Sequence, residues 1–218
     1  GMQSRWDYNL QGQLVESRSP DGASERNEYD HLGRIITRVD PLGYITRFHY
    51  TDLSSEAPNI VQDPHGGKQY LAWNSVGLLA SFTDCSGSIT RYHYDRWGHL
   101  IETIGEEGSR NISQYNLKGQ LFVRTDAINQ NITYAYNQAG DLISIVDAAS
   151  NSVRFDRNQI GEITTYRYGP YIQKFEYDEA GRLKCIVNEN GAKTTFEYDV
   201  MDRLVKQINF DGRTQSNR

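Results

Sequence analysis

Short stretches in which aromatic and polar residues alternate recur along the whole chain. Phe48, His49 and Tyr50 form one such stretch, and residues 92–94 form another. Successive side chains of a strand point to opposite sides, so this period of two predicts strands with one aromatic and one charged face. No stretch sustains the 3.6-residue period of an amphipathic helix. The pattern therefore predicts an all-β chain with essentially no helix.

The alternating stretches belong to a tandem repeat of 21 residues, each copy of which ends its first strand on an anchor residue. The spacing of the anchors is 21 residues, except for 23 between Tyr50 and Trp73 and 20 between Arg157 and Tyr177. Arg157 replaces the aromatic anchor in one copy. The aromatic anchors are Tyr8, Tyr29, Tyr50, Trp73, Tyr94, Tyr115, Tyr136, Tyr177 and Tyr198. Residues 1–218 are thus expected to form a single array of about ten repeats, in which each unit packs against its neighbours.

Nine of the ten anchors are followed directly by Asp or Asn, eight have Gly at the fourth position after them, and nine have Leu or Ile at the sixth. Asp or Asn at the start of a four-residue turn and Gly at its end are typical of a type I turn. A second turn lies in the middle of most repeats, as in residues 40–43 and 63–66. Two turns per repeat predict an antiparallel meander of about twenty strands, forming a long curved strip that is open or spiralling. The glycines of the first turn are Gly12, Gly33, Gly77, Gly98, Gly119, Gly140, Gly161 and Gly181.

The amino-acid composition limits the kinds of molecule that this chain is expected to bind. Only 37% of the 218 residues are hydrophobic and the mean hydropathy is −0.70, but 15 tyrosines supply large side chains that can be buried with a polar tip. The net charge is −5 and Lys and Arg are dispersed, which argues against nucleic acid and an anionic membrane surface. We expect no signal peptide in this segment and no membrane insertion, because no apolar run is long enough to span a membrane.

The residues that carry chemistry follow the repeat and do not form a cluster. Asp30, Asp95, Asp178 and Asp199 recur at one turn position, where capping of backbone N–H groups explains them. His49 and His93 lie two repeats apart, near 20 Å across four strands, which is too far to share a metal ion. Cys85 and Cys185 occupy different repeat positions and predict neither a disulfide framework nor a zinc site. We therefore expect no catalytic residue, cofactor or metal.

The unit Tyr-Asp-x-x-Gly-x-Leu resembles the YD repeat of Rhs proteins, most closely at residues 29–35, 94–100 and 177–183. The family includes bacterial Rhs polymorphic toxins, the shell components of Tc toxins and the teneurins. The resemblance implies a β-sheet shell that encloses a C-terminal toxin domain. It also implies a secreted or cell-surface location for the parent protein, many bacterial members being delivered by type VI secretion. The expected partners are the remainder of the parent chain and the enclosed toxin.

Two departures from the family pattern lead us to expect a segment of a longer protein. We find no Pro- and Gly-rich autoproteolytic core motif and no toxin domain after the last copy, in which Asp202 replaces Gly. An excised strip has two unpaired edge strands, which predicts self-association by strand addition. The alternative function is a cell-surface module that binds carbohydrate or protein in the manner of an adhesin.

Two irregular places leave alternatives open. Residues 51–67 break the pattern, either as a tolerated loop or as a bulge that contacts another part of the parent protein. In the copy around Arg157 the arginine is either a cation stacked on aromatic rings or a local repair of the core. Tyr166, Tyr168 and Tyr171 near it form either core or an exposed cluster that binds sugar or protein.

Overall fold

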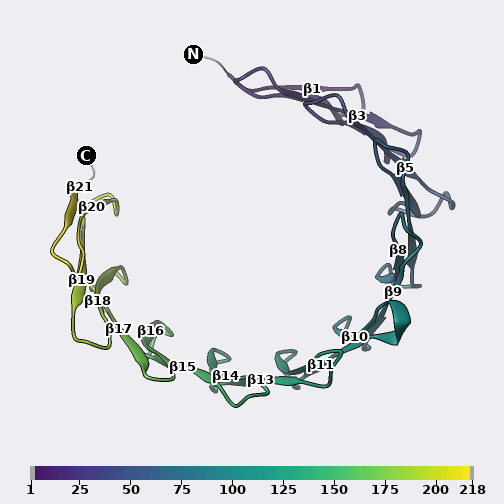
Figure 1. Ribbon diagram of the computed structural model, residues 1–218. Coiled ribbons are helices and arrows are strands. Elements are labelled where there is room, and N and C mark those ends of the chain that lie inside the picture. Colours follow the sequence, from purple (N-terminus) through teal and green to yellow (C-terminus); the bar gives the residue numbers. More distant parts are fainter. Residues whose placement is uncertain (1–2, 217–218) are drawn as a thin grey trace. The chain divides into compact units, whose positions relative to one another are not determined.

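The computed structural model describes residues 3–216, and the chain divides into two compact units, Gly1–Arg110 and Asn111–Arg218. Within each unit every strand pairs antiparallel with the strand that follows it (Figure 1). The described residues contain 21 strands and one short 3-10 turn, η1 (Glu106–Gly108). The expected all-β meander is therefore confirmed, with almost no helix.

The strands of both units are short. The first unit contains β1 (Arg5–Tyr8), β2 (Leu14–Arg18), β3 (Ser24–Tyr29), β4 (Ile35–Val39), β5 (Ile45–His49), β6 (Ile60–Gln62), β7 (Lys68–Trp73), β8 (Leu79–Thr83), β9 (Ile89–Tyr94) and β10 (Leu100–Ile104). β11 (Arg110–Tyr115) starts at the boundary. It is followed by β12 (Leu121–Thr125), β13 (Asn131–Tyr136), β14 (Leu142–Val146), β15 (Ser152–Arg157), β16 (Ile163–Tyr168), β17 (Tyr171–Tyr177), β18 (Leu183–Val187), β19 (Lys193–Tyr198), β20 (Leu204–Ile208) and β21 (Thr214–Ser216).

The registers separate the two faces of the sheet as the alternation predicts. In the β9–β10 pair, Tyr92 lies opposite Thr103 and His93 lies opposite Glu102. Paired residues share a face, so the tyrosine and the histidine–glutamate pair lie on opposite sides. We call the side that carries the anchor side chains the aromatic face. The other side carries ion pairs such as Arg110–Glu102, at 3.2 Å, beside the contact of His93 with Glu102 at 3.0 Å.

The sheet is a single layer with little core. Among residues 3–216 only Thr165, Cys185 and Thr194 are buried. The protein exposes 15,332 Å², whereas even two separate compact domains of half its mass would together expose about 12,300 Å². Both faces of the sheet are therefore largely open. The stability of such a layer must come from contacts between neighbouring strands and turns.

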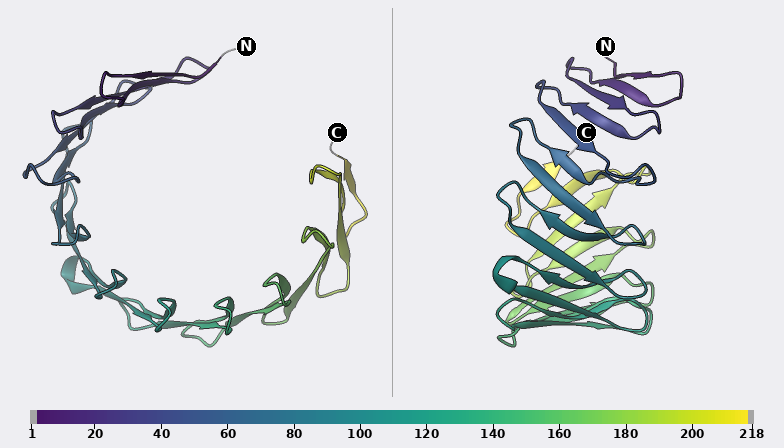
Figure 2. Two further views of the ribbon diagram at one scale, coloured as in Figure 1. Left: turned by 180° about the vertical axis from the view of Figure 1, so that it is seen from behind. Right: turned by 90° about the vertical axis from the view of Figure 1, so that its right-hand side faces the viewer.

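The turns alternate between two opposite edges of the sheet (Figure 2). The turn at Asp95 is typical: the N–H of Gly98 donates to the Asp95 carbonyl at 3.1 Å, and the Asp95 N–H donates to the His99 carbonyl at 3.0 Å. Gly98 has a φ of +88°, so the turn is a type I turn closed by a left-handed residue. We call the turns that directly follow the anchors anchor turns, and those in the middle of the repeats mid-repeat turns.

The last position of a turn does not always require glycine. Asn129, Ser150 and Asp202 adopt φ values of +61°, +66° and +60° at this position. Asp202 thus takes the left-handed conformation that the missing glycine would have supplied. Asn and Asp tolerate this region better than other side chains, whereas a β-branched residue there is strained.

The two irregular repeats change length in different turns. The two additional residues before Trp73 lie in the anchor turn, where a loop over residues 51–59 precedes β6, and the mid-repeat turn at Asp63 keeps the usual hydrogen bonds. In the shortened repeat the mid-repeat turn consists of only two residues, Gly169 and Pro170, between the paired Tyr168 and Tyr171. The strand pairing continues on both sides of each irregularity.

Candidate functional site: the contact between successive repeats

The anchor side chain makes a hydrogen bond that ties each repeat to the one before it. The β8–β9 ladder ends at the pair Ser81 and Arg91, which leaves the Leu79 carbonyl beyond the last rung. The Tyr94 hydroxyl donates to this carbonyl at 3.0 Å. A partly buried carbonyl without a hydrogen-bond donor lowers stability, and the tyrosine hydroxyl provides the donor that the strand ladder lacks at this point. We call it the anchor hydrogen bond.

The anchor hydrogen bond recurs in both units. The hydroxyls of Tyr29, Tyr50, Tyr94, Tyr136, Tyr177 and Tyr198 donate to the carbonyls of Leu14, Ile35, Leu79, Leu121, Ile163 and Leu183 at 2.7–3.0 Å. The Trp73 indole N–H donates to the Pro58 carbonyl at 3.0 Å. Tyr8 and Tyr115 lie opposite Leu14 and Leu121 in the strand registers. The acceptor is thus the backbone of the Leu or Ile six residues after the preceding anchor, or of its equivalent.

Arg157 makes the same contact with a different chemical group. Its Nε–H donates to the Leu142 carbonyl at 3.2 Å, and Nη1 donates to the Gly161 carbonyl at 2.6 Å. The guanidinium therefore takes the place of a tyrosine hydroxyl. Of the two alternatives left open by the sequence, a local repair fits this residue better than a cation stacked on aromatic rings. Arg157 replaces the missing tyrosine by donating to a backbone carbonyl of the preceding repeat.

The anchor turns contain a second regular contact, which the sequence analysis missed. The residue after the anchor pairs with the residue four positions later, and the pairing is chemically complementary. Asp faces a cationic or imidazole partner, in Asp30–Arg34, Asp95–His99, Asp178–Arg182 and Asp199–Arg203, at 2.7–2.9 Å. Asn faces an acceptor, in Asn9–Gln13, Asn116–Gln120, Asn137–Asp141 and Asn158–Glu162, at 2.6–3.0 Å. A carboxylate only accepts, whereas an amide NH₂ donates, so the two side chains are complementary in these eight turns. The turn after Trp73 is an exception, because Leu78 lies four residues after Asn74 and only its backbone N–H bonds the Asn74 side chain. Comparing these two positions across copies would have revealed the rule.

The turn carboxylates are held in their charged form. The Arg34 backbone N–H, together with its side chain, keeps the pKa of Asp30 below its ordinary value. The backbone N–H groups of Arg182 and Arg203, with their side chains, lower the pKa of Asp178 and Asp199 in the same way. Each of these carboxylates accepts two backbone N–H groups through one oxygen, as at Asp30 at 2.9 Å. Their lone pairs are used in closing the turn, as the capping interpretation predicted.

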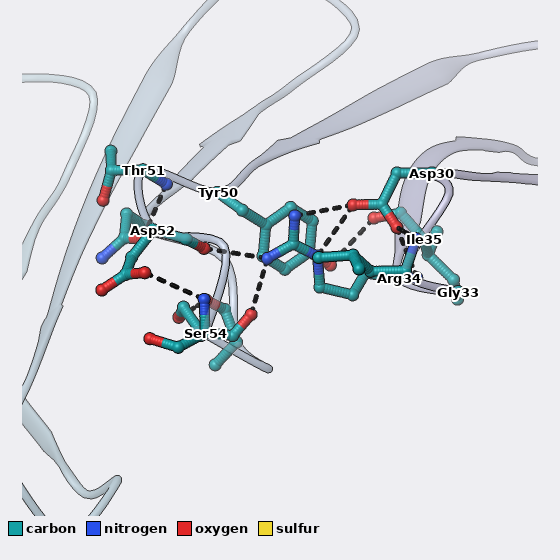
Figure 3. A network of polar contacts seen from close by, with 12 residues as sticks. Asp30, Gly33, Arg34, Ile35, Tyr50, Thr51, Asp52 and Ser54 are labelled. Atoms are coloured by element: carbon teal, nitrogen blue, oxygen red, sulfur yellow. Dashed lines mark hydrogen bonds and ion pairs between the residues drawn. The ribbon is translucent and has the colours of Figure 1, made fainter.

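Arg34 extends this arrangement into the loop of residues 51–59. Its guanidinium lies 4.1 Å from the centre of the Tyr50 ring, and Nη1 donates to the Asp52 and Ser55 carbonyls at 2.9 and 2.8 Å (Figure 3). The side chain is only 14% exposed. The loop is therefore fastened to its own array by one arginine that also closes the preceding turn.

Other side chains at the Arg34 position also reach the next turn. Gln13 Nε2 donates to the Gly33 carbonyl at 3.1 Å, and Gln120 Nε2 donates to the Gly140 carbonyl at 2.8 Å. Arg182 bonds the Asp202 carboxylate at 2.6 Å. Successive anchor turns are thus linked along one edge in each unit.

The tyrosines of the shortened repeat differ in their surroundings: one packs against another ring and two are exposed to solvent. Phe155 and Tyr166 pack against each other with ring centroids 5.8 Å apart, whereas Tyr168 and Tyr171 are exposed at the hairpin tip. A groove of about 240 Å³ lies on the aromatic face, lined by Phe155, Ile163, Tyr166, Gln173, Phe175 and Tyr177. This groove can receive an apolar or partly apolar ligand.

The described residues show no other concentration of reactive groups. Within residues 3–216 no three His, Cys, Asp or Glu side chains are placed to hold a metal ion. Cys85 is exposed, Cys185 is buried, and both are free thiols. None of the helical residues among those described forms a helix of the length and apolarity required to cross a membrane.

Comparison with protein families and curated proteins gives a specific but partial match. The family model of the RHS repeat matches residues 73–110 and 175–214. These segments contain the anchors Trp73, Tyr94, Tyr177 and Tyr198 with their turns. No curated protein matches the chain in sequence.

Solved structures share the fold over nearly the whole chain. A crystal structure of TcdB2-TccC3 without its hypervariable C-terminal region aligns with a TM-score of 0.77 at 18% identity, covering 94% of this chain and 12% of that chain. A second TcdB2-TccC3 structure gives 0.73 with the same identity and coverage. The Photorhabdus luminescens Tc holotoxin pore aligns with 0.64 at 13% identity, covering 98% of this chain and 15% of that chain. At these identities the likeness establishes the fold, and this chain spans less than a sixth of the length of those proteins.

Proposed function

Because the chain belongs to the Rhs/YD-repeat family, we propose that it is a non-catalytic wall segment of a shell that encloses a C-terminal toxin or effector domain. The recurrence of the anchor hydrogen bond carries this proposal. The polar groups of the repeat are used to join one copy to the next, and no buried side-chain N or O atom among the described residues lacks a partner. Such a repeat extends a single-layer sheet with few residues per strand. The wall acts sterically, by separating the enclosed domain from its surroundings.

The proposal assigns each part of the repeat a structural role. The aromatic anchors and Arg157 join successive copies, the turn glycines permit left-handed backbone, and residues 1–218 act as one array. The partners are the remainder of the parent chain and the enclosed domain, and the parent acts outside the producing cell. The single-layer sheet and the likeness to TcdB2-TccC3 support this assignment.

The test uses the longer protein that contains this chain, purified from its native host. Intact mass measurement and N-terminal sequencing of every co-purifying band should reveal a cleaved C-terminal fragment that stays bound until denaturation. Introducing Gly98→Val into the parent should expose this fragment to protease, whereas Ser88→Val should leave it protected. A single uncleaved chain displayed on the cell exterior would overturn the enclosing function.

The aromatic groove on β15–β17 favours a second candidate function, the binding of cell-surface carbohydrate. Tyr168 and Tyr171 extend the groove with exposed rings, and Gln173 supplies an amide within it. Retention on a glycan array should then be lost in the double variant Tyr168→Ser/Tyr171→Ser. Tyr44→Ser removes an exposed ring elsewhere and serves as the control. Equal retention of both variants, or no retention of the wild type, would exclude this candidate.

A further inference from the structure

Three mid-repeat turns close on an aspartate or asparagine followed by a glycine, namely residues 21–22, 190–191 and 211–212. In all three the first residue of the pair is exposed, and the glycine is left-handed, with φ values of +91°, +78° and +79°. A glycine has no Cβ to hinder an approach to its backbone nitrogen. In each pair the carbon of the side-chain carboxyl or amide group can therefore come within reach of that nitrogen.

The three side chains differ in what holds them. Asp21 Oδ1 accepts the Ala23 N–H at 3.2 Å, and Asp211 Oδ1 accepts the Arg213 N–H at 3.0 Å. Both carboxylates are thus bonded to the backbone beyond the glycine, and an ionised carboxylate is a poor electrophile. No hydrogen bond within residues 3–216 involves the Asn190 side chain. Its neutral amide is therefore free to turn toward the following backbone nitrogen.

The surroundings of Gly191 leave room for a reaction at this nitrogen. Apart from its chain neighbours, no heavy atom lies within 4 Å of the position that a Cβ would occupy there. The Gly191 N–H donates to the Asn188 carbonyl at 2.9 Å, and this bond must open before the nitrogen can react. The turn is exposed at the edge of the sheet, where such a bond opens without unfolding of the array.

We propose that Asn190 is a site of spontaneous deamidation in the folded protein. A base in the solvent takes the proton of the Gly191 N–H, and the nitrogen attacks Cγ of Asn190. The new N–Cγ bond forms as the Cγ–Nδ2 bond breaks, so that ammonia leaves with a proton from water and a succinimide ring remains. Water then opens the ring at either of its carbonyl carbons. Opening at Cγ yields an ordinary aspartyl residue, whereas opening at the backbone carbonyl yields an isoaspartyl residue whose chain runs through Cγ.

Both products change the turn. Each replaces a neutral amide by a carboxylate beside Glu189, so that two like charges lie next to each other at the tip. The isoaspartyl product also lengthens the backbone of the turn, which displaces the Gly191 N–H from the Asn188 carbonyl. The adjoining end of the β18–β19 pair, where Val187 lies opposite Lys193, is then loosened. This inference concerns the chemistry of one turn, so it and the proposed shell function can fail separately.

The experiment follows the Asn190 amide by peptide mapping of the full chain, kept folded at neutral pH and physiological temperature. Trypsin releases residues 185–193, in which fragmentation locates the exchange of an amide for an acid. Digestion in isotopically heavy water labels any conversion that arises during the preparation. Asn129 is the matched control in the same sample: it is exposed, and no hydrogen bond of the described chain involves its side chain, but Gln130 follows it instead of glycine.

Asn190 should convert progressively in the folded chain, and the isoaspartyl product should be methylated by an isoaspartyl-specific methyltransferase, while Asn129 should keep its amide. Gly191→Asn should suppress the conversion at position 190 to the level of Asn129. Asparagine is tolerated in this left-handed position, since Asn129 itself has a φ of +61°, and thermal melts should show that the variant folds. If Asn190 kept its amide as completely as Asn129, or converted only after unfolding in urea, the proposal would be overturned.

Hydrogen exchange tests the effect on the turn. The Ala192 N–H donates to Asn188 Oδ1 at 2.9 Å, across the turn that the isoaspartyl product lengthens. Protection of the Ala192 amide should therefore be lower in the isoaspartyl fraction than in the unconverted protein. Equal protection in the two fractions would overturn the inferred loosening of the hairpin.

Discussion

The longest and the shortest repeats of the chain differ by three residues, yet both keep the anchor hydrogen bond. In the long repeat the two additional residues enter the anchor turn, and the acceptor moves from the sixth to the eighth residue after the anchor, Pro58. In the short repeat the mid-repeat turn is reduced to Gly169 and Pro170 and the repeat as a whole is one residue shorter, but the acceptor Ile163 remains at the sixth position after Arg157. In both repeats the donor, Trp73 or Tyr177, still reaches a carbonyl of the preceding copy.

This comparison separates the constant part of the repeat from the adaptable part. The turns absorb changes in length because they lie at the edges, where loops are tolerated. The anchor hydrogen bond is kept because the ladder ends before the acceptor carbonyl, as it does at Leu79 and Leu142. Its donor varies among tyrosine, tryptophan and arginine, so what is retained is an N–H or O–H group at that point rather than an aromatic ring.

The largest effect is expected where a regular turn is forced out of its backbone conformation. Gly98 has a φ of +88°, and a Cβ there would meet only the Leu78 side chain at 3.8 Å. Gly98→Val therefore fits sterically but is strained in the backbone, which should lower the free energy of unfolding by about 2–3 kcal/mol. Ser88→Val, outside the left-handed region, should cost less than about 1 kcal/mol. Equal denaturation midpoints for the two variants would contradict the turn assignment.

The next effect concerns the fastening of the long repeat. Arg34 and Arg203 occupy the same position in their repeats, and each pairs with the turn aspartate four residues before it. Their side chains are 14% and 77% exposed, respectively. Arg34→Ala also removes the bonds to the Asp52 and Ser55 carbonyls and should cost about 2 kcal/mol. Arg203→Ala should cost less than about 0.5 kcal/mol, as is usual for exposed ion pairs.

Proteolysis provides a second measurement of the same comparison. With the Arg34 side chain removed, the loop of residues 51–59 should be cut faster under native conditions, because its carbonyl contacts are lost. Cleavage in the Arg203→Ala variant should match the wild type. If the Arg34 variant were as resistant as the wild type, the loop would have to be held by its other contacts, such as those of Asn59.

A smaller effect is expected at the anchors themselves. Tyr94→Phe removes only the hydroxyl that bonds the Leu79 carbonyl and should cost about 1 kcal/mol. Arg157→Tyr loses the Nη1 bond to the Gly161 carbonyl but exchanges one donor to the Leu142 carbonyl for another, so it should cost less than about 1 kcal/mol. Arg157→Ala, which leaves that carbonyl without its donor, should cost about as much as Tyr94→Phe or more. Urea denaturation measures all three, and a larger loss in Arg157→Tyr than in Arg157→Ala would contradict the shared role.

The fold could be predicted from the sequence because its signals are local and repeated. The alternation around Tyr92 and the turn residues of Asp95 and Gly98 are contained within a single repeat. The role of Arg157 was not predictable in the same way, since its acceptor, Leu142, lies in the preceding copy. The fastening by Arg34 depends on how a long loop folds back, which no periodic pattern describes.

The pairing rule of the anchor turns gives the finest comparison, because two otherwise similar turns should respond differently to acid. Backbone and side-chain hydrogen bonds from Arg182 lower the pKa of Asp178, whereas the turn at Asn116 is closed by an amide and Gln120. A lowered folded pKa contributes stability that is present above the ordinary aspartate value of about 3.9 and is lost as the pH falls through the folded value. Protection of the Arg182 amide against hydrogen exchange should therefore fall, relative to that of the Gln120 amide, as the pH is lowered below the ordinary aspartate pKa of about 3.9. The Asp178→Asn variant should abolish this difference, and equal acid sensitivity of the two wild-type turns would show that the carboxylate charge does not hold the turn.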